Sequence, residues 1–213
     1  MITMSRVLPI LFNTDMVQAI LDGRKTVTRR IIKPQPEPDL KYKLGICVNG
    51  NILYVRETYA KHPKMEEYYY RADGECNGHS TEWGCPPGMK VTDNCELCAW
   101  LDGYIKWSPS IHMPKSAARI WLQVTDVRVE RLQDMSRDDA IKEGIHFCEC
   151  PDGYTWKAQA DMNSCYITTM WAMKALWNST IKKSDLDRYG WDANPWVWVI
   201  EFERCEKPED RYV

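Results

Sequence analysis

The stretch that decides the fold is Gly23-Arg24-Lys25-Thr26-Val27-Thr28-Arg29-Arg30, in which four basic side chains crowd seven positions beside two threonine hydroxyls. Asn13-Thr14-Asp15, a little upstream, offers the side-chain oxygens that cap a helix N-terminus. Four apolar residues then follow at helical spacing: Met16, Val17, Ile20 and Leu21. Gly23 lies where a glycine usually ends a helix. The pattern predicts a short helix that leads directly into a basic turn.

The direction of the basic side chains depends on how this turn continues. In an extended chain alternate side chains share a face, so Thr26, Thr28 and Arg30 would point one way. Lys25, Val27 and Arg29 would then point the other way. A helix-to-strand turn that breaks this phase would instead bring Lys25 beside Thr28, and both arrangements stay open here.

Strand-like segments dominate the rest of the chain. The clearest is 119–132, where apolar and polar residues alternate and the phase slips at Thr125-Asp126, as a β-bulge would cause. Further strands are expected at 52–59, 67–72, 104–107 and 196–203. Helices are expected at 136–142, capped by Ser136 and ended by Gly144, and at 164–178. The apolar face of the second helix is predicted to consist of Ile167, Met170, Trp171, Ala175 and Leu176. We therefore expect an α+β protein whose strands close into a mixed barrel.

Composition limits the possible partners. The 213 residues, 44% of them hydrophobic, are enough for one domain with sizeable insertions. With a net charge of −2, the molecule as a whole does not attract polyanions, so any contact with nucleic acid requires a local basic patch. The sequence contains ten Trp and eleven Tyr, which suit wet binding surfaces as well as cores. No long apolar run and no signal peptide are found, so we expect a cytoplasmic protein without membrane contact.

Nine cysteines in such a chain favour metal ligands or free thiols over disulfides. The region at about 73–103 is dense in Cys, Gly, Pro and Asn and lacks periodicity, which indicates an insertion. Four cysteines there are candidate ligands of one structural zinc ion: Cys76, Cys85, Cys95 and Cys98. His79 is an alternative ligand, and Cys148 with Cys150 could supply the second arm if the chain folds back. A set of free thiols remains the other interpretation.

Four motifs resemble a known family. Gly23, Lys25 and Arg30 match the signature of the ASCH family, a glycine followed by a lysine two positions later and an arginine five beyond it. Three further pieces are similar to the longer ASCH proteins of bacteria and their phages: Tyr54-Val55-Arg56-Glu57-Thr58, Ser110-Ile111-His112-Met113-Pro114-Lys115 with Ala118-Arg119, and Trp196-Val197-Trp198-Val199-Ile200-Glu201-Phe202. The resemblance implies a PUA-like mixed β-barrel with a few flanking helices over 1–213, interrupted by the Cys-rich insertion. It also implies a cleft for RNA or a modified nucleoside.

One branch of the family is similar to a small bacterial amidohydrolase that deacetylates acetylcytidine. The resemblance implies a catalytic set of Lys25, Thr28 and Glu143, with Thr28 as nucleophile, Lys25 as its base and Glu143 exchanging protons. From the residues alone, the favoured interpretation of Glu143 is an exposed glutamate neutralised by Lys142.

The leading interpretation is an RNA- or nucleoside-binding protein with a basic cleft around Lys25, Thr28, Arg30 and Glu143. The residues expected to contact nucleic acid are Arg24, Arg29, Arg30, Arg56, Ser110, His112 and Lys115. The alternatives are the amidohydrolase, an RNA-cleaving enzyme with His112 or Lys25 as general base, and a purely structural or partner-binding role.

Overall fold

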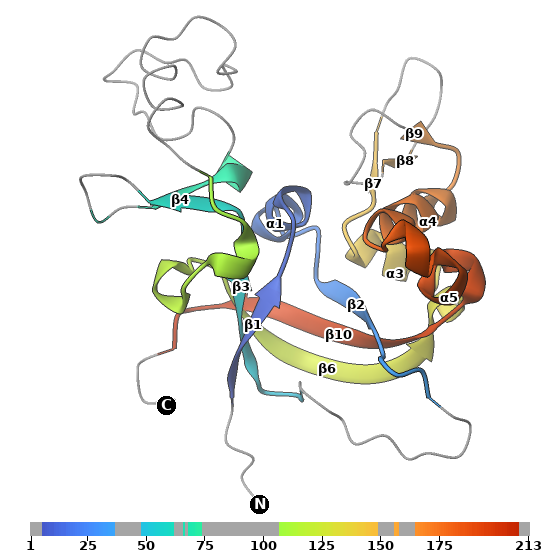
Figure 1. Ribbon diagram of the computed structural model, residues 1–213, viewed down its shortest axis with the longest axis horizontal. Coiled ribbons are helices and arrows are strands. Elements are labelled where there is room, and N and C mark those ends of the chain that lie inside the picture. The colour runs from blue at the N-terminus through green and yellow to red at the C-terminus, as the bar shows by residue number, and fades with distance from the viewer. Residues whose placement is uncertain are drawn as a thin grey trace, which may run out of the picture. The chain divides into compact units, whose positions relative to one another are not determined.

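The computed structural model describes residues 6–36, 48–61, 66, 68–73, 107–148, 156–157 and 165–208 (Figure 1). The chain divides into two compact units. The first consists of Met1–Leu8, Ala19–Leu53 and Trp121–Val213, and the second of Pro9–Gln18 and Tyr54–Ile120. The single domain over 1–213 stays a prediction.

Three antiparallel strands form the centre of the first unit: β2 (Val27–Ile31), β10 (Trp196–Cys205) and β6 (Trp121–Arg131). Their register places Thr28 opposite Ile200 and Arg29 opposite Val199. The register of β10 against β6 shifts between Glu201 and Phe202, which face Asp126 and Val124. The bulge predicted at Thr125-Asp126 is therefore confirmed.

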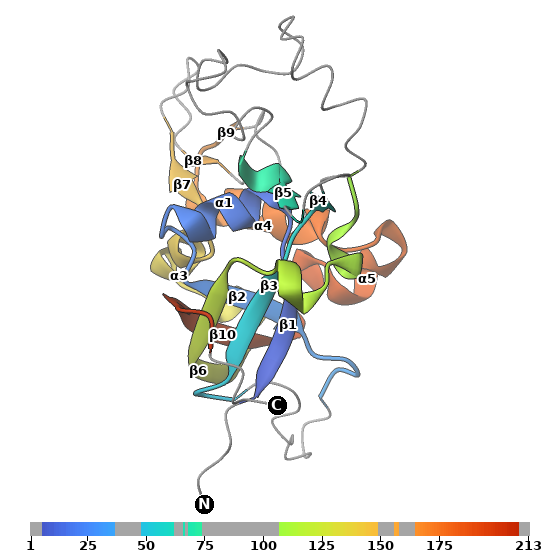
Figure 2. The same cartoon turned by 90° about the vertical axis from the view of Figure 1, so that its left-hand side faces the viewer.

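The complete sheet has the strand order β1-β3-β6-β10-β2, with β1 at Val7–Leu11 and β3 at Ile52–Arg56 (Figures 1 and 2). Together with the helices, this sheet confirms the α+β class. β1 and β2 stand at the two ends of the order, and among the described residues no pairing joins them. The closed barrel is therefore not shown.

Helix α1 (Thr14–Leu21) begins and ends as its sequence predicts. The Met16 backbone N–H donates to Asn13 Oδ1 at 2.9 Å, which caps the first turn. Gly23 follows the helix with φ of 73°, a backbone conformation that side chains with a Cβ rarely adopt.

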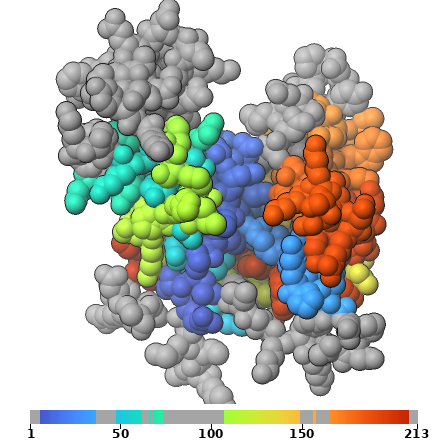
Figure 3. All heavy atoms as spheres, in the orientation of Figure 1, coloured from blue at the N-terminus to red at the C-terminus, as the bar shows by residue number. Residues whose placement is uncertain are grey.

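Helices α3 (Arg137–Lys142), α4 (Thr169–Ser179) and α5 (Leu186–Tyr189) lie wholly in the first unit, whereas α1 is divided between the two units. A capping box starts α3, because the Asp139 N–H donates to Ser136 Oγ while Asp139 Oδ2 accepts from the Ser136 N–H. The end of β2 lies close to α5, since the Lys33 ammonium is 4.5 Å from the centroid of the Tyr189 ring. In Figure 3 the pale-blue atoms that follow β2 accordingly lie beside the orange helical region.

The predicted apolar face of α4 is wrong in part. The helix buries Ala172, Met173, Leu176 and Trp177, whereas Trp171 is 64% exposed. Ile167 lies before the helix begins and is 61% exposed. A small sheet of β7 (His146–Phe147), β8 (Trp156–Lys157) and β9 (Cys165–Tyr166) precedes α4 along the chain.

The second unit contains the hairpin of β4 (Tyr59–Lys61) and β5 (Tyr68–Tyr70). The strand expected at 67–72 is thus shorter than predicted, because 3₁₀ geometry begins at Arg71. Two further 3₁₀ turns, Ser110–His112 and Lys115–Ala117, each start after a proline.

The predicted zinc ligands Cys76, Cys85, Cys95 and Cys98 lie outside the described residues, as does most of the insertion at about 73–103. The zinc ion therefore stays a prediction. Within the described ranges, none of the helices combines the length and the apolar character needed to cross a membrane.

Candidate functional site

The basic turn is fixed to the ends of two helices. The N–H groups of Arg24 and Lys25 both donate to the carbonyl of Ala19, at 2.8 and 3.0 Å, which closes the end of α1. The Thr26 N–H donates to the carbonyl of Lys142 at 2.9 Å, at the end of α3. The backbone thus places Lys25 next to the last turn of α3.

Lys25 is buried, with 2% of the residue exposed, and its ammonium is surrounded by oxygen atoms. Nζ donates to the Val27 carbonyl at 2.8 Å, to the Glu143 carbonyl at 3.0 Å and to Glu143 Oε2 at 2.5 Å. Burial lowers the pKa of Lys25, and the Glu143 carboxylate offsets only part of that shift. This lysine is therefore more easily deprotonated than a lysine in water.

Glu143 is the carboxylate on which the cluster converges. It caps the C-terminus of α3 and is 3% exposed. Its Oε2 accepts from Lys25 and its Oε1 from Arg29 Nη1, at 2.5 and 3.2 Å. The alternative of an exposed glutamate neutralised by Lys142 is wrong, because Glu143 is buried and its partners come from the basic turn.

Arg29 is buried without a full set of hydrogen bonds. Besides Glu143, its guanidinium has two more distant acidic neighbours, with Nη2 3.7 Å from Glu130 Oε2 and 3.9 Å from Asp139 Oδ2. Nε and Nη2 have no hydrogen-bond partner among the described residues. Because burial of an incompletely bonded cation costs stability, the fold gains little from this arrangement.

The opposite face of β2 carries Thr28 and Arg30. Arg30 Nη1 donates to Thr28 Oγ1 at 2.7 Å and to the Arg29 carbonyl at 3.1 Å. Thr28 is 1% exposed, whereas Arg30 is half-buried. The strand alternation expected for Thr28, Arg29 and Arg30 is confirmed, since Arg29 contacts Glu143 while the other two contact each other. Burial lowers the pKa of Arg30, and the negative charge of Glu143 opposes this shift. Arg30 therefore lies close enough to Glu143 to interact with it electrostatically.

Arg24 lies at the edge of this cluster. Its Nη2 is 2.7 Å from Asp22 Oδ2, and its Nη1 donates to the Gly144 carbonyl at 3.4 Å. His146, which the sequence did not point to, lies nearby, and burial together with the positive charge of Arg24 lowers its pKa. His146 Nδ1 is buried without a hydrogen-bond partner in the described part of the chain.

Four of the predicted binding residues belong to the second unit. Arg56, expected to need a partner, donates from Nε to the Met113 carbonyl at 2.8 Å and from Nη2 to the Ile111 carbonyl. It thereby holds the turn that carries Ser110 and His112. Ser110 is half-buried, whereas His112 and, in the next turn, Lys115 are exposed.

The second unit also contains an ionic cluster that the sequence did not predict. Glu57, 1% exposed, accepts from Nε and Nη2 of Arg119 at 3.0 and 3.1 Å. Arg119 Nη1 also donates to Asp73 Oδ2 at 2.7 Å, and its guanidinium lies 4.0 Å from the centroid of the Tyr70 ring. Burial raises the pKa of Glu57 although the hydrogen bonds from Arg119 oppose the shift.

The fold and the first cluster together define an α+β protein in which a basic turn surrounds one buried carboxylate. Among solved structures, the chain is similar to one described as the ASCH domain from Lactobacillus crispatus JV V101, with 11% identity and a TM-score of 0.40. The superposition covers 93% of this chain and 79% of that one. No protein-family model matches the sequence, and the search of curated proteins found no match. The structural match names the family that the four sequence motifs resemble; its score is too low to transfer any residue or function.

Proposed function

We propose that the protein binds RNA or a modified nucleoside at the basic turn, with Lys25, Thr28, Arg30 and Glu143 at the centre of the site. The observation that carries the proposal is the convergence of two basic side chains of this stretch, Lys25 and Arg29, on a single buried carboxylate, while the half-buried Arg30 lies on the other face of β2. A buried ionic cluster is rarely more stable than apolar residues of the same volume, so a role in recognition accounts for it better than stability does. The PUA-like barrel over a single domain remains part of this proposal.

Each residue has a distinct part in the proposed site. Glu143 fixes Lys25 and Arg29 in place, and these two set the position of β2 against α3. Arg30 and Arg24 are half-buried and are the cations that a phosphate or a base edge would meet. The Thr28 hydroxyl orients Arg30 by accepting its hydrogen bond.

Replacement of Arg30 by glutamine is expected to weaken the binding of single-stranded RNA by about 10- to 150-fold, because a charged hydrogen-bond donor is lost. The logarithmic salt dependence of binding should also decrease by about one unit if a phosphate contact disappears. Fluorescence anisotropy of a labelled oligonucleotide at several salt concentrations measures both quantities.

Arg188 supplies the matched control, since it is an exposed arginine of α5 whose guanidinium lies over the Tyr189 ring, 5.2 Å from its centroid. Arg188→Gln should leave the affinity within about twofold, as expected for a surface charge outside the basic turn. Equal losses in both variants, or no RNA binding by the unchanged protein, would contradict the proposal.

The second candidate function is hydrolysis of an N-acylated cytidine-type nucleoside, which the lowered pKa of Lys25 favours. Thr28 Oγ would attack the acyl carbon while its proton passes to a neutral Lys25, and the nucleoside amine would leave with that proton. Water would then release the acid from the acyl-threonine and restore the hydroxyl. This candidate is second because Thr28 is only 1% exposed and its hydroxyl contacts Arg30, on the face of β2 opposite the Lys25–Glu143 pair. A substrate therefore has little access to the nucleophile, and the proton transfer to Lys25 requires a rearrangement.

Thr28→Val separates the two functions, since it removes the hydroxyl and keeps the shape of the side chain. A hydrolase should lose all acetate release from acetylcytidine in this variant. An RNA-binding protein should show no acetate release in either form and only a small loss of RNA affinity in the variant, because the Arg30 guanidinium remains. Acetate release by the unchanged protein that survives Thr28→Val would remove Thr28 as the nucleophile.

A further inference from the structure

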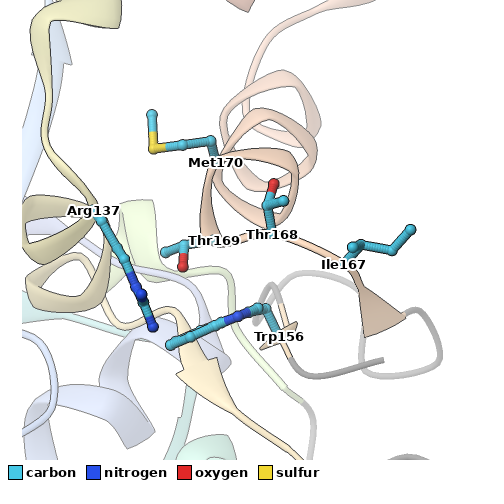
Figure 4. A pocket seen from close by; sticks show the side chains of 6 residues that line it. All are labelled: Arg137, Trp156, Ile167, Thr168, Thr169 and Met170. Atoms are coloured by element: carbon cyan, nitrogen blue, oxygen red, sulfur yellow. The ribbon is translucent and has the colours of Figure 1, made fainter. Parts of the chain in front are cut away.

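A cavity of about 290 Å³ lies in the first unit where α3, β8 and the start of α4 meet (Figure 4). Six residues line it: Arg137, Trp156, Ile167, Thr168, Thr169 and Met170. Its volume is close to the lower limit of small-molecule pockets, about 300 Å³, which suits one flat ring with a small substituent.

Trp156 provides the aromatic wall of this pocket. The Arg137 guanidinium lies 4.9 Å from the centroid of the indole ring, and Phe147 meets the same ring edge-on with centroids 5.6 Å apart. Two neighbours thus fix the orientation of a half-buried tryptophan. An oriented indole beside a guanidinium is the combination on which unstacked nucleobases pack.

Thr169 provides a polar group inside the pocket. The residue is 3% exposed, and in Figure 4 its hydroxyl is turned toward Arg137 and Trp156. We find no hydrogen-bond partner for it in the described part of the chain, whereas the neighbouring Thr168 Oγ1 is occupied by the Trp171 N–H at 3.2 Å. A hydroxyl in this position can donate to, or accept from, the edge of a base.

The rim of the pocket is apolar and exposed. Ile167, which lines it, is 61% exposed, and Phe147, which packs on Trp156, is 59% exposed. Both side chains are therefore available to pack against a ligand that enters the pocket.

The charge at the pocket identifies the class of ligand. Arg137 is exposed and forms no ion pair within the described ranges, so its charge is available to an anion beside the ring. A nucleotide combines the flat heterocycle, the hydrogen-bonding edge and the negative charge that Trp156, Thr169 and Arg137 would recognise.

We infer that this pocket binds the base of a nucleotide, stacked on Trp156, with Thr169 at the base edge and Arg137 at the phosphate. Both sites share α3: Arg137 is its first residue and Glu143 its C-cap. At 1.5 Å per residue the two positions are about 9 Å apart along the helix axis, so one strand can reach both. The inference rests on the proposed function, and its ligand is either a free nucleotide or one nucleotide of a strand.

Trp156→Leu is expected to weaken the binding of a labelled single-stranded RNA of about ten nucleotides by about 5- to 150-fold, the range for loss of one base–aromatic stack. Arg137→Gln, at an exposed position that cannot affect the core, should weaken it as well. The matched control is Arg188→Gln, because Arg188 also lies over an aromatic ring, Tyr189, at 5.2 Å but outside the pocket. The control should bind RNA as the unchanged protein does.

A strand in which successive bases are replaced one at a time by abasic sites tests the role of the base. At one position the abasic strand should bind the unchanged protein more weakly, and Trp156→Leu should cause no further loss with that strand. If Trp156→Leu and Arg137→Gln bind RNA normally while Arg30→Gln does not, the pocket inference is overturned and the proposed function stands.

If the unchanged protein binds no RNA, the proposed function fails. The pocket inference is then tested separately by measuring the binding of free nucleotides. Equilibrium dialysis with AMP and UMP should then show binding that Trp156→Leu and Arg137→Gln abolish. Absence of binding to both nucleotides would overturn the inference as well.

Discussion

Glu143→Gln is expected to lower the free energy of unfolding by about 3–5 kcal/mol, the range for removal of one partner from a buried ion pair. Lys25 and Arg29 both lie against this carboxylate, at 2.5 and 3.2 Å, and neither side chain has access to water. The glutamine amide keeps the shape but supplies no negative charge. Lys25 would then be buried without a counterion, and Arg29 would keep only its more distant acidic neighbours Glu130 and Asp139, at 3.7 and 3.9 Å. Urea denaturation followed by circular dichroism measures the loss.

Glu203→Gln is the control, since Glu203 is an exposed carboxylate on the neighbouring strand β10, and it should change stability by less than about 0.5 kcal/mol. The double variant Lys25→Met/Glu143→Gln should recover part of the loss, because the cation that loses its counterion is removed together with the carboxylate. A loss of less than about 1 kcal/mol in Glu143→Gln would mean that the cluster is solvated rather than buried.

Arg119→Gln is expected to destabilise the second unit by a similar amount, about 3–5 kcal/mol at neutral pH. Glu57 is 1% exposed and loses both hydrogen bonds from the guanidinium. Arg71→Gln, at an exposed arginine of the same unit, should have little effect and serves as the control.

The effect of Arg119→Gln should depend on pH in a predictable direction. Burial raises the pKa of Glu57 above its usual 4.5, so the folded protein binds this proton more tightly than the unfolded chain does. Stability therefore falls as pH rises from about 4.5 through the folded pKa. Without Arg119 the hydrogen bonds that hold the Glu57 pKa down are lost, so this pKa rises further and the pH range over which stability falls extends upward. The loss of stability caused by Arg119→Gln should therefore be larger at about pH 8 than at about pH 5. A deficit that is independent of pH would falsify the assignment to Glu57.

Elements fixed by local chemistry could be predicted from the sequence. Asn13 and Gly23 define the two ends of α1, and the break in alternation at Thr125-Asp126 marks the bulge of β6. Each of these signals is contained in a few neighbouring residues of the sequence. The apolar face of α4 was predicted less well, since several faces of a tryptophan-rich helix look apolar and tertiary packing selects among them. Closure of a barrel depends on strands far apart in the chain, about which alternation says nothing.

The candidate site shows the same division between local and distant contacts. The shared face of Thr28 and Arg30 follows from strand geometry alone. Lys25 and Glu143 are 118 positions apart, and only the family resemblance placed them together. No motif linked Glu57 to Arg119, and no pattern in the sequence pointed to Trp156, so the second cluster and the pocket required the structure.

Helix α3 has six residues, too few to persist in water without help from the rest of the protein. Its help comes from two side chains that also face the basic turn: Asp139 caps the first turn and lies 3.9 Å from Arg29, while Glu143 ends the last turn against Lys25. We therefore expect local opening of α3 to be coupled to rearrangement of these cations. Amide hydrogen exchange in α3 should report on the electrostatic state of the basic turn, with exchange slowing when an anion there tightens the cluster and quickening when the carboxylates are protonated.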